Sequence, residues 1–178
     1  TPGSSSAVTT PLVYCTPLAT RNDYYISGFS TSGGVSNITN TGTTQGITSI
    51  GYSNYTAQSV SQYANSSINF SVTIYPNTSA NAGIALWVDW NNDGTFSTGE
   101  RMYNSNSYVT SASGSFTVPI GTVAGNYRMR VMADYWATSP DACTITNNSG
   151  RVGEAEDYTV NVQSTCAPSG VKVGSNSP

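Results

Sequence analysis

The chain has 178 residues, with six basic and nine acidic side chains and a net charge of −3. Charged residues make up only 8% of it, against about 25% in an ordinary globular protein, and this length suits one domain with tails. The basic residues are too few and too scattered to neutralise a run of phosphates, which excludes a nucleic-acid partner. The sequence has no run of about 18 apolar residues, so it predicts no membrane insertion.

The predicted elements are short strands. Residues 1–11 are rich in Ser, Thr and Pro and are expected to form a flexible arm or linker. From there to residue 163, alternating apolar and polar residues are separated by turns rich in Gly, Asn and Ser, and no helical period is present. The fold class is therefore all-β, an antiparallel β-sandwich of jelly-roll-like or immunoglobulin-like type. The expected core positions are Ile68, Phe70, Val72, Ile74, Ile84, Leu86, Val88, Phe116, Val118, Ile120, Tyr127, Met129, Val131, Ala133, Tyr158, Val160 and Val162.

Three cysteines fit one disulfide bond with one cysteine left over. Cys15 opens the expected domain and Cys143 lies in a loop near its end, so these two are predicted to pair. A disulfide presumes an oxidising compartment, which predicts a secreted or cell-surface protein. Three free thiols in a cytosolic protein are the alternative. Cys166 lies in residues 164–178, a linker or the start of a following module, and its partner would belong to a neighbouring module or another copy of the chain.

Residues 89–100, with the sequence DWNNDGTFSTGE, predict a calcium site. Oxygen-bearing side chains stand at positions 1, 3, 5, 9 and 12 of this segment and Gly at position 6, which matches the twelve-residue loop of an EF-hand. A strand rather than a helix is expected before the loop. Bound calcium would therefore stabilise a β-protein and would not open a pair of helices, as it does in a calcium sensor. A plain Asn-Asp-Gly turn is the alternative. The expected Ca²⁺ ligands are Asp89, Asn91, Asp93, the carbonyl of Thr95, Ser97 and Glu100.

A second acidic cluster precedes the last expected strand. Glu154, Glu156 and Asp157 could add calcium ligands, form ion pairs with Arg128 and Arg130, or act in acid–base catalysis. The sequence identifies no carboxylate that faces them, so structural or ion-pair roles are favoured over catalysis.

Five segments, in order, resemble the GEVED domain family. They are YC at 14–15, GYSNYT at 51–56, WVDWNNDGTF at 87–96, YRMRVM at 127–132 and GEAEDYTV at 153–160. The family is named for a Gly-Glu-Val-Glu-Asp motif, and here Ala155 stands in place of the valine. The resemblance covers about residues 14–162 and implies a β-sandwich module of secreted, multidomain bacterial proteins, found beside proteases, glycan-degrading enzymes or adhesins. The segment after Cys166 resembles the opening of a fibronectin type III-like module, which accompanies the family.

The composition argues against an enzyme. The chain has no histidine, which excludes Ser-His-Asp and Cys-His catalysis and any zinc site with histidine ligands. A glycosidase or lyase that uses only carboxylates is the remaining enzymatic alternative.

Two non-catalytic functions remain. Twelve Tyr and three Trp in a polar, weakly charged chain suit stacking on sugar rings, which predicts an accessory module that binds a polysaccharide or cell-surface glycan. Tyr135 and Trp136 are the expected ligand-binding residues, joined by Trp90 if the calcium loop displays it, whereas packing in the core is the alternative for each ring. The second function is a structural or adhesive module, or a fibre subunit, that assembles by adding its terminal segments to a neighbouring sheet.

Overall fold

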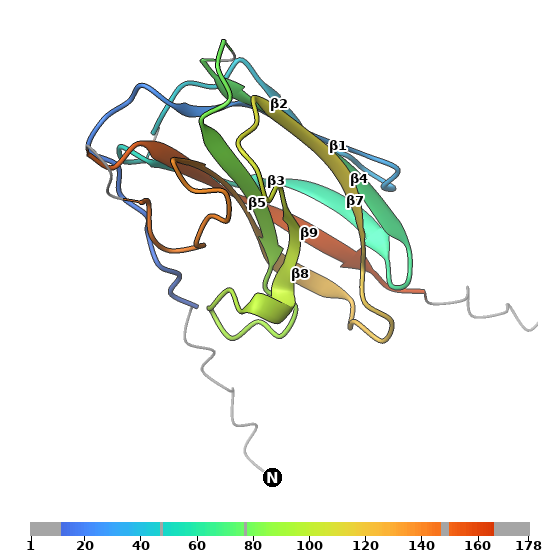
Figure 1. Ribbon diagram of the computed structural model, residues 1–178. Helices are drawn as coiled ribbons and strands as arrows, with labels where there is room; N and C mark the ends of the chain where they lie inside the picture. Colours follow the sequence, from blue (N-terminus) through green and yellow to red (C-terminus); the bar gives the residue numbers. More distant parts are fainter. Residues whose placement is uncertain (1–11, 47, 77, 147–149, 166–178) are drawn as a thin grey trace, which may run out of the picture.

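The computed structural model describes residues 12–46, 48–76, 78–146 and 150–165 (Figure 1). The elements are β1 (Tyr25–Ser32), β2 (Thr39–Thr41), β3 (Tyr52–Tyr63), β4 (Ser67–Tyr75), β5 (Ala82–Val88), the 3-10 helix η1 (Thr98–Glu100), β6 (Arg101–Asn104), β7 (Ser111–Thr117), β8 (Gly125–Tyr135) and β9 (Gly153–Gln163). In these ranges no helix has the length and apolar character to cross a membrane.

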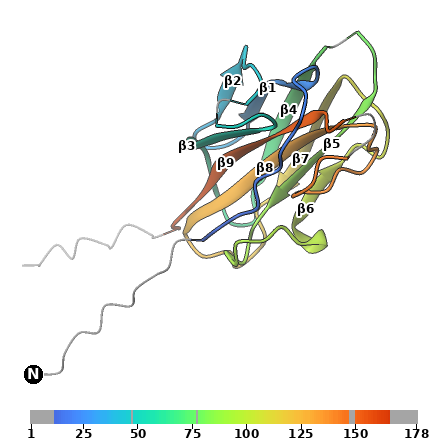
Figure 2. The ribbon, with the colours of Figure 1, turned by 90° about the vertical axis from the view of Figure 1, so that its left-hand side faces the viewer.

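The strands form two sheets packed face to face (Figures 1 and 2). One sheet has the order β2-β1-β4-β7 and the other β3-β9-β8-β5-β6. The predicted all-β sandwich is confirmed. The pairing of β3 with β9 is parallel, whereas the other strand pairs are antiparallel, as the sequence predicted. No hairpin joins β3 to β9, so no turn fixes their relative direction.

The four-stranded sheet follows the alternation that the sequence predicts. Along β4, Ile68, Phe70, Val72 and Ile74 are buried and the residues between them are exposed. Because successive side chains of a strand point to opposite faces, one face of this sheet packs on the core and the other meets solvent.

The five-stranded sheet is covered on both faces. All seven residues of β5 are buried. Leu86 packs in the main core with the other inward-facing residues, whereas Trp87 belongs to a second apolar cluster on the outer face, together with Met132, Ala142 and Ile145. Residues 14–19 and 137–146 lie over this outer face, and Figure 2 shows the N-terminal segment crossing it. We call these two segments the outer cover.

One predicted core residue is wrong. Ile120 is 83% exposed, while Phe116 and Val118 before it are buried. The strand ends at Thr117, and the chain then turns, with the N–H of Thr122 donating to the carbonyl of Pro119. The apolar alternation continues in the sequence for three residues after the strand has ended.

Candidate functional site

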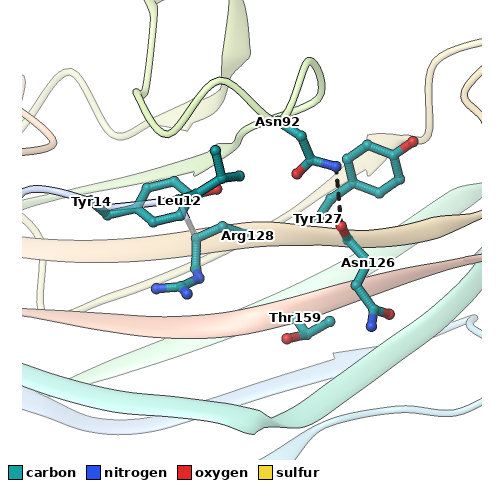
Figure 3. A pocket seen from close by; sticks show the side chains of 7 residues that line it. All are labelled: Leu12, Tyr14, Asn92, Asn126, Tyr127, Arg128 and Thr159. Atoms are coloured by element: carbon teal, nitrogen blue, oxygen red, sulfur yellow. Dashed lines mark hydrogen bonds between the residues drawn. The ribbon is translucent and has the colours of Figure 1, made fainter. Parts of the chain in front are cut away.

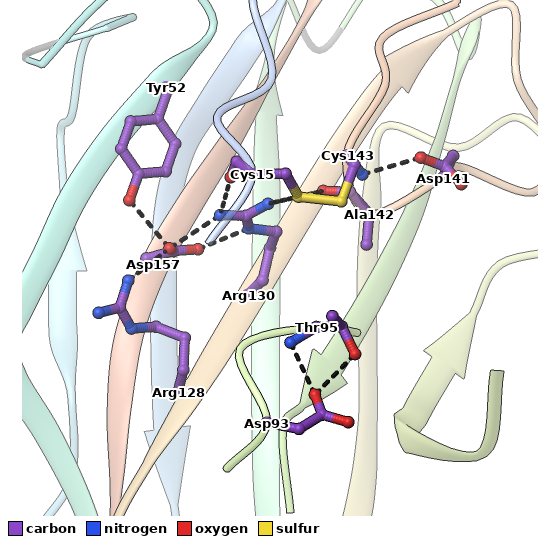
Figure 4. The surroundings of a disulfide bond; sticks show 10 residues. All are labelled: Cys15, Tyr52, Asp93, Thr95, Arg128, Arg130, Asp141, Ala142, Cys143 and Asp157. Atoms are coloured by element: carbon purple, nitrogen blue, oxygen red, sulfur yellow. Dashed lines mark hydrogen bonds and ion pairs between the residues drawn. A yellow bond between two sulfur atoms is a disulfide. The ribbon is translucent and has the colours of Figure 1, made fainter. Parts of the chain in front are cut away.

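The acidic segment at the start of β9 places carboxylate side chains on both faces of its sheet. Alternation along the strand turns Glu154 and Glu156 toward the interior of the sandwich and Asp157 toward the outer cover. Asp157 accepts hydrogen bonds from Nε and Nη2 of Arg130, at 2.7 and 2.9 Å, and from Nη1 of Arg128, at 2.9 Å (Figure 4). The predicted pairing of the two arginines with this acidic cluster is confirmed for Asp157.

Arg130 is fully buried and connects the sheet to the outer cover. Its Nη1 donates to the carbonyl of Ala142 at 2.8 Å, and its Nη2 donates to the carbonyl of Cys15 at 2.9 Å. The predicted disulfide between Cys15 and Cys143 is confirmed, with 5.5 Å between the Cα atoms, and it closes above the guanidinium group (Figure 4). The two halves of the outer cover are therefore joined by one covalent bond and by one buried cation.

Glu154 and Glu156 are fully buried inside the sandwich. Glu154 accepts hydrogen bonds from the N–H groups of Ile26 and Gly46 and from the hydroxyl of Ser53. Burial raises the pKa of both carboxyl groups, and the charge of Glu154 raises that of Glu156 further. Because neither side chain has surface contact with solvent, their contacts suit a structural role.

The structure folds residues 89–100 into a loop held by its own acids. Both oxygens of Glu100 are engaged: Oε1 accepts the N–H groups of Trp90 and Asn91, at 3.0 and 3.4 Å, and Oε2 accepts the N–H and hydroxyl of Ser97, at 2.9 and 2.8 Å. Glu100 thus joins the two ends of the loop.

Asp89 organises the turn at the other end. Its Oδ1 accepts the N–H of Asp93 at 3.2 Å, and its Oδ2 accepts the N–H of Gly94 at 3.0 Å and the hydroxyl of Tyr14 at 2.7 Å. Gly94 has a φ of +84°, which favours glycine at this position. Burial and the neighbouring carboxylate of Asp89 raise the pKa of Tyr14 well above its usual value, so its hydroxyl stays neutral.

The loop suits calcium in its donors but does not gather them at one point. Asp89, Asp93 and Glu100 supply carboxylate oxygens, which hard cations prefer. Asp93 is exposed, and its Oδ1 accepts the N–H and hydroxyl of Thr95, contacts that lower its pKa. In the described ranges, no three or more acidic, histidine or cysteine side chains lie together as a metal-binding group.

Trp136 lies among other aromatic rings where β8 ends. Its ring centroid is 5.0 Å from that of Tyr135 and 5.6 Å from that of Tyr108, in edge-to-face contacts, and Tyr135 lies 4.7 Å from Tyr24. Trp136 is 41% exposed and has a φ of +66°, a conformation uncommon for a bulky residue. The structure thus brings Tyr135 and Trp136 together, as the sequence predicts, and adds Tyr108, which carried no signal.

Trp90 occupies a different environment. Its ring lies 5.5 Å from Tyr127 and 6.5 Å from Phe116, and its Nε1 donates to the sulfur of Met102. It is half-buried and packs against the main core. The loop therefore turns Trp90 inward, and it does not join Trp136.

A cleft of about 320 Å³ opens beside the start of β8 (Figure 3). The outer cover's N-terminal end, the 89–100 loop, β8 and β9 each contribute to its walls. Sequence analysis did not find this cleft, because its residues come from four separate segments. Its lining residues are Leu12, Tyr14, Asn92, Asn126, Tyr127, Arg128 and Thr159.

The fold and the buried Arg130–Asp157 pair beneath the disulfide define a disulfide-bonded β-sandwich module. Residues 83–161 match the model of the GEVED domain family, which supports the resemblance of this part of the chain to that family. The matched part runs from β5 to β9 and contains the 89–100 loop, both arginines and the acidic segment of β9. A search of curated proteins finds no match to this chain. The expected fibronectin type III-like segment and Cys166 lie outside the described residues.

Proposed function

We propose that this protein is a non-catalytic extracellular module that binds carbohydrate through the aromatic cluster around Trp136, with calcium at residues 89–100 adding stability. The disulfide supports an oxidising compartment. The absence of histidine from the sequence supports a binding rather than a hydrolytic role.

The observation that carries the proposal is the constrained, exposed ring of Trp136. The backbone N–H of Trp136 donates to the carbonyl of Asn81 at 2.8 Å, and the backbone carbonyl of Trp136 accepts the hydroxyl of Tyr108 at 3.2 Å. A non-glycine residue in the left-handed region persists only where its surroundings enforce it, and such residues concentrate at functional sites. A tryptophan ring fixed in this way offers a stacking face for a sugar with little loss of side-chain entropy.

Polar side chains of β6 reach Ser139 in the outer cover and offer hydrogen bonds for sugar hydroxyls. Nη1 of Arg101 and Nδ2 of Asn104 both donate to the hydroxyl of Ser139, at 3.0 and 3.3 Å. Ser139 follows Trp136 by three residues in the outer cover. Oδ1 of Asn104 is buried and has no hydrogen-bond partner within the described residues.

The test is migration of the purified protein through native gels that contain a panel of neutral and acidic polysaccharides. Retardation by one class, lost in Trp136→Gly, is the expected result. Glycine removes the ring and tolerates the positive φ of this position, so the variant keeps its fold.

Tyr63→Ala is the matched control. Tyr63 is 40% exposed, close to the value for Trp136, and lies at the end of β3 away from the aromatic cluster. Retardation that is equal in the wild type and Trp136→Gly would contradict this site. Migration unaffected by every polysaccharide would contradict the carbohydrate function and favour a structural module, which sedimentation of the protein at increasing concentration would then examine.

A further inference from the structure

The cleft beside the start of β8 contains an arginine whose charge is not balanced locally. Among the described residues that line it, Arg128 is the only charged one. Its Nη1 is bonded to Asp157, but that carboxylate also accepts two hydrogen bonds from Arg130 and one from the hydroxyl of Tyr52. One negative charge therefore faces two guanidinium groups, and of the two only Arg128 reaches solvent.

Tyr14 holds the guanidinium group of Arg128 in place. The central carbon of this group lies 4.4 Å from the centroid of the Tyr14 ring, a cation–π contact. The Tyr14 hydroxyl is anchored in turn by Asp89, whose carboxylate also accepts the N–H groups of the turn that follows it and does not line the cleft. Asp157 and Tyr14 thus fix the guanidinium group of Arg128. Its Nε and Nη2 have no hydrogen-bond partner within the described residues.

The other walls of the cleft suit a sugar ring. Leu12 and the ring of Tyr14 form an apolar side, and Figure 3 shows Asn126 and Thr159 on the side of Arg128. Oδ1 of Asn126 accepts a bond from Asn161, which leaves its Nδ2 without a partner in the described part of the chain. A cleft of about 320 Å³ lies at the small end of ligand pockets, which span roughly 300–1,000 Å³.

We propose that this cleft binds the carboxylate of a uronic acid unit in an acidic polysaccharide, with Arg128 as the anion-binding residue. Guanidinium groups bind carboxylates through paired hydrogen bonds, and here one side of the fork remains available. The inference rests on the proposed carbohydrate function but concerns a second site. Arg128 lies in β8 seven residues before its last residue, Tyr135, a distance of roughly 23 Å along an extended strand, and Trp136 follows directly after that end.

The experiment measures binding of oligogalacturonate and of an uncharged glucose oligosaccharide by calorimetry, at low and at physiological salt. The charged ligand should bind the wild type more tightly, and its affinity should fall as salt is added. Arg128→Gln should weaken its binding by about tenfold or more, the loss expected for one charge-assisted hydrogen bond. Arg151→Gln makes the same change of charge at an exposed arginine outside the cleft and should leave the affinity unchanged.

A second variant tests the same cleft without removing Arg128, so the test does not depend on the folding of Arg128→Gln. Asn126 is exposed, and Asn126→Asp keeps the Oδ1 acceptor for Asn161 while it places a negative charge in the cleft. This variant should also weaken binding of oligogalacturonate, by repulsion. Equal affinity for the charged and neutral ligands, or unchanged oligogalacturonate affinity in both variants, would overturn the proposal. Loss of neutral-glycan binding in Trp136→Gly would concern only the first site, so failure at one site leaves the other testable.

Discussion

Arg130 is a buried charge. Its removal would leave the carboxylate of Asp157 and two backbone carbonyls in an apolar interior without their hydrogen-bond donor. It satisfies both oxygens of Asp157 and the carbonyls of Cys15 and Ala142 with charge-assisted hydrogen bonds. Phe96 lies 4.8 Å from its guanidinium carbon and closes the site from the side of the 89–100 loop. Burial of an ion pair adds little net stability by itself, but loss of one partner is costly, by about 3–5 kcal/mol. This explains why an almost uncharged chain keeps an arginine here.

Asp134 gives a prediction of pH dependence at the level of one residue. It is fully buried, and its carboxylate accepts the N–H and hydroxyl of Thr146. Burial raises its pKa to about 6, with a smaller contribution from the charge of Asp141. The folded state thus binds the proton more tightly than the unfolded chain, whose aspartate pKa is about 3.9. This contribution to stability is complete below about pH 4 and is lost as the pH rises through 6.

The expected result is a lower free energy of unfolding at pH 7 than at pH 4.5, measured by urea denaturation. Asp134→Asn should reduce this difference by about 2 kcal/mol. Glu154 and Glu156 are shifted in the same direction, so part of the difference should remain in the variant. Asp23→Asn, at an exposed position, is the control. A difference as large in Asp134→Asn as in the wild type would contradict the assignment.

At the scale of elements, the 89–100 loop joins β5 to β6 through η1. The spacing of oxygen-bearing residues and a glycine predicted a calcium loop here with Glu100 as a ligand, and the structure shows Glu100 accepting N–H groups from both ends of the loop. The spacing did not predict that Tyr14 would bond to Asp89, because this contact links residues 75 positions apart. Such contacts depend on the path of the N-terminal segment across the sheet, which no local pattern encodes.

Calcium dependence is the prediction that belongs to this loop. If calcium binds here, an ion concentration a hundredfold above the dissociation constant adds about 2.7 kcal/mol of stability. The melting temperature of the wild type should then rise with CaCl₂ and fall with chelator. Asp93→Asn should respond less, because it removes one exposed carboxylate and keeps the size of the side chain. A wild-type melting temperature that is the same in calcium and in chelator would refute the calcium proposal.

The alternation of apolar and polar residues predicts the buried positions correctly in some strands and incompletely in others. It located the buried residues of β4 because that sheet has one solvent face. It missed the burial of Ala85 because a segment from the N-terminus and one following β8 cover the outer face of β5. Ile120 failed because it lies in the turn at residues 119–122, after the sheet has ended, whereas Val118 still packs in the core. The aromatic cluster was found in part, because neighbouring Tyr135 and Trp136 stand out whereas Tyr108 comes from a different loop.

At the scale of the whole molecule, the outer cover depends on the disulfide and on Arg130 together. Cys15 and Cys143 are 128 residues apart in the sequence, and one lies in each half of the cover. A crosslink over so long a loop removes much of the entropy of the unfolded chain, worth about 4–5 kcal/mol in the chain-entropy model. The same bond holds in place the Cys15 carbonyl that accepts from Arg130. Breaking it should therefore destabilise the cover more than the sandwich beneath.

We expect this difference to be visible when Cys15 and Cys143 are both replaced by alanine, in a Cys166→Ser background that prevents thiol exchange. The free energy of unfolding in urea should fall by about 2–5 kcal/mol. Brief digestion with thermolysin should cut within residues 14–19 or 137–146 before it cuts β4, whose strand pairs on both sides. The Cys166→Ser protein with its disulfide intact is the control and should resist cleavage at those positions. Cleavage that begins in β4, or equal stability of the two proteins, would show that the cover is held without the disulfide, which would leave Arg130 as its principal anchor.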